Sequence, residues 1–144
     1  MTEHYPEGRF PRGETSSSPQ RPAQRLAASV LTFDLAALLE QVRHEASWER
    51  GDHNAMTLVK EPDFRIVLVA MKTDARIQEH HAAGRISIQT LGGRVRLKLP
   101  DQTIELPTGH LLALEAGIPH TVEALEPSAF LLTISWPAGR SATD

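Results

Sequence analysis

The chain has 144 residues, no cysteine and a formal net charge of −3. This length suits one domain built around a single core. The lack of cysteine excludes a disulfide framework, thiolate metal ligands and a cysteine nucleophile, and it fits a reducing compartment. The slightly acidic charge argues against nucleic acid or an acidic membrane surface as a partner. Without an apolar leader or a membrane-spanning run, we expect a cytoplasmic protein that binds no membrane.

The N-terminal part divides into a tail and a helical segment. Residues 1–25 are rich in proline and serine and are predicted to be a disordered tail. Residues 26–50 should contain one amphipathic helix, between Asp34 and Ala46, that packs on the outside of the rest of the domain. Asp34 has the side chain and the position of an N-cap. The apolar residues that recur at helical spacing are Leu35, Leu38, Leu39 and Val42.

Residues 51–137 have the pattern of short β-strands, and residues 138–144 form a second tail. Runs of four to nine residues with alternating or continuous apolar character are separated by glycine, proline and aspartate. The expected strands are Met56–Lys60, Phe64–Lys72, Arg85–Leu91, Arg94–Leu99, Thr103–Leu106, Leu111–Leu114, His120–Leu125 and Ala129–Trp136. This arrangement favours an antiparallel sandwich or barrel.

The residue patterns of two of these strands indicate whether their outer faces are solvated or covered. In Arg94–Leu99, three basic residues alternate outward and are interpreted as a solvated face. The strand Phe64–Lys72 is apolar on both faces after Arg65, so its outer face must also be covered. The predicted helix is one candidate for this cover, and a second copy of the chain is the other.

Two further stretches carry glycines and histidines at a fixed spacing. The first contains His80 and closes with Gly93, and the second contains Gly109, Gly117 and His120. Read together, they resemble the paired motifs of the cupin superfamily. The resemblance implies an all-β fold of the cupin type, an antiparallel β-barrel (a double-stranded β-helix or jelly roll) with one N-terminal α-helix, and it implies a homodimer.

The resemblance to the metal-binding positions of the motifs is incomplete. Ala82 stands at the second histidine of the first motif, Ile86 at its glutamate and Asp74 at its opening glycine. In the second motif, Glu115 replaces the proline and Ala124 the asparagine. The sequence therefore predicts a small cupin with degenerate metal-binding motifs.

The first functional hypothesis is a small-molecule-binding protein without an assigned catalytic residue. If Ile86 occupies the inward position of the motif's glutamate, strand alternation also turns Ile88 inward, and Val122 lies on the same face as His120. A small organic ligand would then contact His80, His120, Ile86, Ile88 and Val122.

The alternative hypothesis is a mononuclear metal-dependent cupin enzyme, an oxygenase or isomerase. His80 and His81 are adjacent, so only one of them can point inward on a regular strand. A register shifted by one residue would turn Glu79 and His81 inward, beside His120. Two histidines and one carboxylate suit Fe, Mn, Ni or Zn as divalent ions. The candidate metal ligands are therefore Glu79, His80, His81 and His120.

Overall fold

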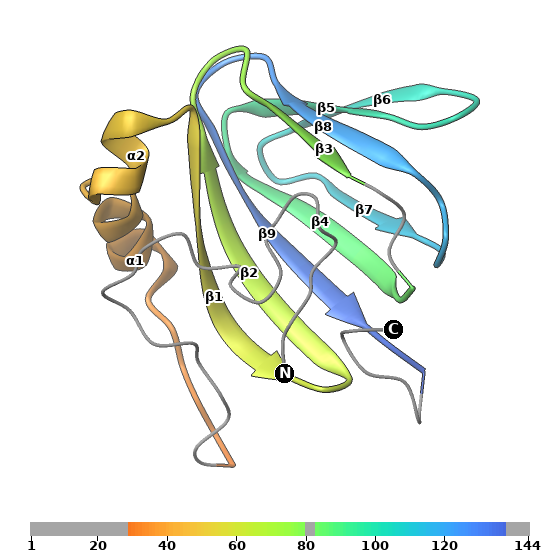
Figure 1. The fold of residues 1–144 in the computed structure, drawn as a ribbon, viewed down its shortest axis with the longest axis horizontal. Coiled ribbons are helices and arrows are strands. Elements are labelled where there is room, and N and C mark those ends of the chain that lie inside the picture. The colour runs from red at the N-terminus through yellow and green to blue at the C-terminus, as the bar shows by residue number, and fades with distance from the viewer. Residues whose placement is uncertain (1–28, 80–82, 138–144) are drawn as a thin grey trace.

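The computed structural model describes residues 29–79 and 83–137, and these contain two short helices followed by nine strands (Figure 1). The helices are α1 (Leu35–Val42) and α2 (Ala46–Arg50). The strands are β1 (His53–Glu61), β2 (Phe64–Met71), β3 (Arg76–Glu79), β4 (Arg85–Gly92), β5 (Arg94–Lys98), β6 (Thr103–Pro107), β7 (Leu111–Leu114), β8 (His120–Ala124) and β9 (Ser128–Ser135).

The strands form two antiparallel sheets that enclose the main core. Sheet A has the order β1-β2-β9-β4-β7 and sheet B has the order β3-β8-β5-β6. Inward residues of both sheets form one buried apolar cluster, which includes Val69, Phe130 and Leu97. Inside it, the Thr90 hydroxyl of sheet A donates a hydrogen bond of 3.1 Å to the Leu106 carbonyl oxygen of sheet B. The predicted all-β jelly-roll barrel is confirmed.

The predicted helix is present, but it ends at Val42 instead of continuing to Ala46, and a second short helix follows it. Asp34 caps α1 as predicted, accepting a hydrogen bond from the Ala37 N–H at 3.1 Å. At the other end, the buried Asn54 amide of β1 donates to the Val42 carbonyl oxygen at 2.8 Å and to a Glu45 carboxylate oxygen at 2.9 Å. These bonds tie the end of α1 to the barrel, and Glu45 takes an extended backbone conformation before α2 begins.

All eight predicted strands exist, but β3 was not predicted. Its four residues include one large apolar side chain, Ile77, which lies in the main core. A strand this short and polar shows no detectable alternation of apolar and polar residues. It is specified by its pairing with β8, in which Ile77 is the register partner of Val122.

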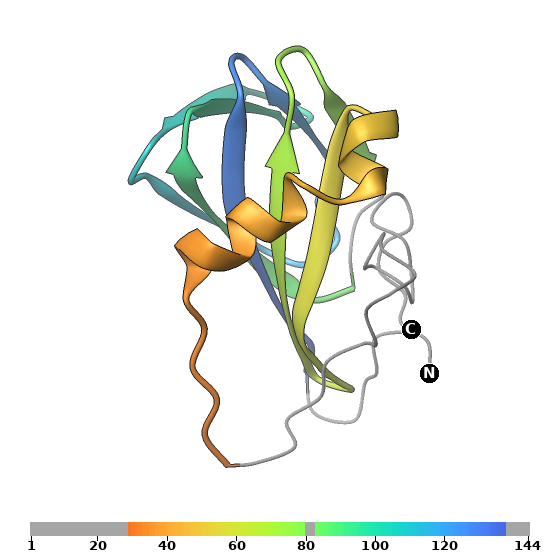
Figure 2. The same cartoon turned by 90° about the vertical axis from the view of Figure 1, so that its left-hand side faces the viewer.

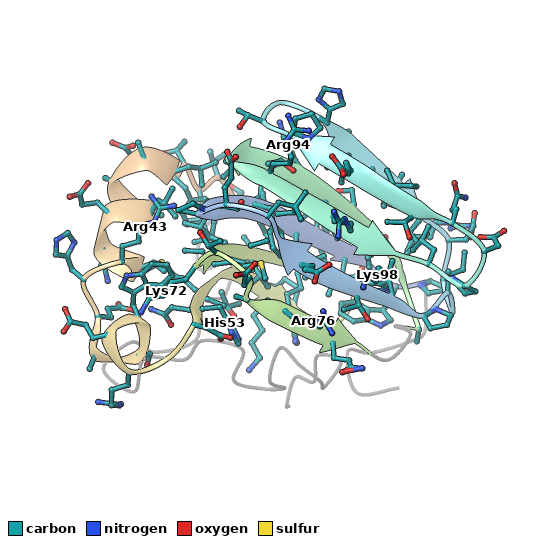
Figure 3. All side chains as sticks on the ribbon, turned by 90° about the horizontal axis from the view of Figure 1, so that it is seen from above. Arg43, His53, Lys72, Arg76, Arg94 and Lys98 are labelled. Carbon is teal, nitrogen blue, oxygen red and sulfur yellow. The ribbon has the colours of Figure 1, made fainter. Side chains whose placement is uncertain are left out.

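The two helices cover the part of the outer face of sheet A that β1 and β2 form. A second buried cluster contains Val42 of α1, Met56 and Leu58 of β1, and Leu68 and Ala70 of β2. Figure 2 shows α1 lying across this sheet. Lys72, after β2, places its ammonium nitrogen 5.0 Å from the centroid of the Trp48 ring on α2, and Figure 3 shows Lys72 beside the helices. No helix in the described ranges is long and apolar enough to cross a membrane.

Four described positions of the cupin-like motifs have left-handed backbone conformations: Asp74, Gly93, Gly109 and Gly117. Gly93 has φ 77°, and a Cβ atom there would clash with the backbone of Pro127 and Ser128, so the β4–β5 turn requires glycine. Asp74 has φ 69° and is the one residue other than glycine with positive φ in the described chain. Asp74 stands where the motif has glycine, and aspartate is one of the few other residues that adopt this conformation.

The outer face of sheet B carries a network of ion pairs, as expected for a solvated face. Glu123 of β8 accepts from Arg76 at 2.8 Å and lies 3.5 Å from Arg96 and 3.7 Å from Lys98. The hydrogen bond from Arg76 lowers the pKa of the Glu123 carboxyl below its ordinary value of 4.5, against the opposing effect of desolvation, and the positive charges of Lys98 and Arg96 lower it further. Arg76 and Lys98 are labelled on this sheet in Figure 3.

We predict that the second cluster is needed for stability. The Leu68 side chain is fully buried between β2 and the helices, whereas Leu111 is 63% exposed. Leu68→Ala should therefore lower the free energy of unfolding by about 2–5 kcal/mol, and the matched variant Leu111→Ala should lower it by less than about 0.5 kcal/mol. Urea denaturation measures both changes. Equal effects would show that the helices do not seal this face.

A second prediction concerns the pH dependence of stability. Because the folded-state pKa of Glu123 lies below the unfolded-state value, its charged form stabilises the fold at neutral pH, and this contribution is lost as pH falls through the folded-state pKa. Glu123→Gln should therefore be less stable than wild type at pH 7, and the difference should shrink below about pH 4.5. The exposed Glu126→Gln serves as control and should behave like wild type. A difference that stays constant down to pH 2 would contradict the prediction.

Candidate functional site

One end of the barrel holds His120 and Ile86, and we call it the His120 end. In sheet A it is formed by Arg65 at the start of β2, Ile134 near the end of β9 and Ile86 at the start of β4, which are register partners in that order. Leu114 at the end of β7 pairs with Ile86, and a five-residue connection leads from it to His120. The His120 end lies toward the lower right of the barrel in Figure 1.

His120 is held in one orientation inside this end. It is 6% exposed and lies on the same face of β8 as the core residues Val122 and Ala124. Its Nδ1 lies 3.0 Å from the Ile118 carbonyl oxygen. A carbonyl oxygen only accepts, so Nδ1 carries the hydrogen, and in the neutral ring Nε2 carries a lone pair. That nitrogen can accept a proton, accept a hydrogen bond or coordinate a metal ion.

The three predicted apolar contacts of the ligand are all inward residues. Ile86, Ile88 and Val122 belong to the main core and are nearly completely buried. Ile86 lies in the outermost layer of the His120 end, beside Leu114 and Ile134. Ile88 and Val122 lie one layer deeper, so Ile86 is the best placed of the three to contact a ligand.

The predicted metal ligands are described only in part. His80 and His81 lie outside the described residues, and for Glu79 the backbone alone is described. The β3–β8 register makes Glu79 the partner of His120. The sequence placed both residues among the tentative ligands, and the pairing of β3 with β8 brings their backbones together.

The described side chains do not make a metal site. Within residues 29–78 and 83–137, no three histidine, aspartate or glutamate side chains could hold one ion together. At the His120 end this part of the chain offers the single imidazole of His120, and Ile86 presents a hydrocarbon side chain where the motif has a carboxylate.

A hollow of about 120 Å³ opens beside the His120 end. It is lined by Arg85, Glu115, Ala116, Ser135, Trp136 and Pro137, none of which was predicted to bind a ligand. Arg85 and Glu115 form its charged rim, with Arg85 Nε 3.1 Å from Glu115 Oε1. Trp136 follows β9 and is 5% exposed, so the hollow reaches the wall of the main core.

The sequence reasoning missed the buried charge at this end. Arg65 has no exposed surface, and its guanidinium carbon lies 5.7 Å from the centroid of the Trp136 ring. Its register partner on β1 is Lys60, which is 8% exposed. The sequence did indicate this burial. Side chains two residues apart on a strand share a face, so Arg65 lies on the same face as Val67, Val69 and Met71, the inward residues of β2.

Comparison with solved structures identifies the architecture. No family model matches the chain, and no curated protein matches it. Similar solved structures include a conserved protein of unknown function from Streptococcus pyogenes, at 22% identity and a TM-score of 0.65 over 83% of this chain and 98% of that one.

Two more similar structures carry the name of a cupin or of an enzyme. A cupin superfamily protein from Desulfitobacterium hafniense has 18% identity and a TM-score of 0.63 over 81% of this chain and all of that one. A variant of oxalate decarboxylase from Bacillus subtilis has 20% identity and a TM-score of 0.54 over 58% of this chain and 25% of that one. The chain therefore has the fold of a small cupin.

Proposed function

We propose that the protein binds a small organic ligand at the His120 end of the barrel. The observation that carries the proposal is His120, an imidazole buried among apolar side chains and fixed by its hydrogen bond to Ile118. Binding sites of small molecules are typically apolar pockets with a few well-oriented polar groups. A hollow lined by Arg85, Glu115 and Trp136 opens at the same end of the barrel, and His120 is not among the residues that line it. The fold does not select a ligand, since similar structures include an enzyme and a protein of unknown function.

His120 allows a direct test. In a thermal-shift screen of small organic compounds, those that raise the melting temperature of wild type should have no effect on His120→Ala, because the variant lacks the polar group that orients the ligand. His110→Ala is the matched control, since His110 is exposed and lies in the turn before β7. Hits that persist in His120→Ala would contradict the proposal.

The competing function is a metal-dependent enzyme, and two observations favour keeping it as the alternative. Metal-binding histidines commonly donate their second ring N–H to a carbonyl oxygen, as His120 does to Ile118. Glu79 is the register partner of His120. In this reading Glu79, His81 and His120 would hold the ion, with His80 as the other candidate, and a divalent metal would supply Lewis-acid or oxygen chemistry.

Elemental analysis separates the two functions. If our proposal holds, purified wild type should contain metal well below one ion per chain, and Ile86→Glu should raise metal affinity by more than about tenfold by adding a carboxylate at an inward position. If the chain is a metalloenzyme, wild type should be fully occupied, and Glu79→Ala or His81→Ala should abolish binding. Full occupancy in wild type would overturn our proposal.

We also propose a homodimer formed through the outer face of sheet A that the helices leave open. Phe64 is 37% exposed there, and the neighbouring Ile66 and Leu131 are half-buried. A second copy would cover this apolar stripe on β2 and β9.

Light scattering at micromolar concentration should give the mass of two chains for wild type and of one chain for Phe64→Arg, because a charge in the centre of an apolar interface opposes association. Leu111→Arg, on the more distant β7, should remain dimeric. A monomeric wild type would contradict this proposal.

A further inference from the structure

A row of four side chains crosses the outer face of sheet A at the end where the β1–β2 turn lies. Glu61 of β1 is the register partner of Phe64 of β2, and Phe64 is in turn the partner of Ser135 on β9. Ser135 is also the partner of Arg85 on β4. The next residues along β2, β9 and β4 point into the barrel, so strand alternation turns this row outward. In Figure 2, β1 and β2 continue past α1 to the turn that joins them, so α1 does not cover the row.

The hollow of about 120 Å³ adjoins this row. Ser135 and Arg85 belong both to the row and to the lining of the hollow. The backbone N–H of Trp136, another lining residue, donates a hydrogen bond of 3.1 Å to the carbonyl oxygen of Asp63, which precedes Phe64. The same end of the sheet therefore carries an aromatic side chain that is 37% exposed and, one strand away, a hollow. An engineered cavity of about 150 Å³ binds benzene, so the hollow is about the size of a phenyl ring.

The row is complementary to its own reverse. From β1 to β4 it presents a carboxylate, a phenyl ring, the border of the hollow and a guanidinium. A twofold axis that runs along the strands between β2 and β9 sets each row against the reversed row of a second copy. Glu61 then faces the partner's Arg85, and Phe64 faces the hollow at the partner's Ser135.

The charged groups of the row can make this contact and keep their contacts within the chain. Glu61 has an interaction in its own chain, and Arg85 is paired with Glu115 at 3.1 Å. A carboxylate accepts several hydrogen bonds at once, and a guanidinium carries five N–H donors. Arg85 is exposed, so its free N–H groups can reach a second carboxylate.

We propose that the homodimer forms around this row, with the Phe64 ring of each copy in the hollow of the other and Glu61 against the partner's Arg85. This inference rests on the homodimer proposed above and names the contacts across its interface. Aromatic side chains that fill a pocket of the partner contribute most of the binding energy of an interface. Complementary charges beside them fix how the two copies are aligned.

Charge reversal tests the pairing of Glu61 with the partner's Arg85. Glu61→Arg and Arg85→Glu each set like charges against each other, so each should raise the dissociation constant of the dimer by more than about tenfold in analytical ultracentrifugation. An equimolar mixture of the two variants should form dimers again, because every contact between them then joins opposite charges. Within one chain the two residues are three strand spacings apart, roughly 14 Å, so a contact inside the chain cannot restore the dimer. Glu105→Arg, on the outer face of sheet B, is the control and should behave like wild type.

Ser135→Trp tests the hollow and decides the matter if Glu61→Arg does not fold. An indole at this exposed position would occupy the hollow and exclude the partner's Phe64, so the dissociation constant should again rise by more than about tenfold. Thr103→Trp makes a matched substitution at an exposed position of β6 in sheet B and should leave the dimer intact. A Ser135→Trp variant that dimerises like wild type overturns the proposal.

The remaining outcomes separate this arrangement from the homodimer itself. If wild type is monomeric, or if Phe64→Arg remains dimeric, the homodimer through this face is wrong and the arrangement fails with it. If Phe64→Arg dissociates the dimer but the mixed charge variants do not associate, the two copies use this face in another arrangement. The homodimer proposal then stands, and the pairing of the row with its reverse is wrong.

Discussion

Strand β2 is buried on both faces, and the rest of the molecule is arranged around that constraint. Its inward residues Val67, Val69 and Met71 lie in the barrel core, and its outward residues Leu68 and Ala70 lie under the helices. A strand with two apolar faces is stable only between two covering layers. Sheet B supplies one layer and the two helices supply the other, so the helices are part of the domain core and not an appendage.

The same constraint explains the position of Arg65. Arg65 is the first inward residue of β2, so its charge lies at the end of the core and not in the middle. There its guanidinium carbon lies 5.7 Å from the centroid of the Trp136 ring. The opposite end is closed by the tight β4–β5 turn, which requires Gly93. The two ends of the barrel therefore differ chemically: one is closed by a turn, and the other combines an oriented imidazole with buried positive charge.

Features fixed by local sequence could be predicted, whereas features fixed by distant contacts could not. Asp34 caps its helix through the nearby Ala37 N–H, and Gly93 makes its turn because glycine readily adopts the left-handed backbone conformation found there. The break between α1 and α2 was missed because it depends on Asn54, a residue of the barrel that bonds to Val42. Strand β3 was missed because its pairing with β8, and not its own composition, defines it. For the site, the inward position of His120 followed from the motif. Arg65 lies near the start of the barrel sequence and Trp136 near its end. No local sequence pattern therefore predicts the contact between their side chains.

Binding at the His120 end is the central claim, and side-chain NMR of His120 measures it directly. In a titration of wild type with a compound that raises its melting temperature, the resonances of the His120 imidazole should shift and saturate. The hydrogen on His120 Nδ1 should stay in place, because it is bonded to the Ile118 carbonyl oxygen. Shifts confined to Arg76, Arg94 and Arg96 on the outer face of sheet B would show binding to the surface only, and would contradict a ligand site at the His120 end.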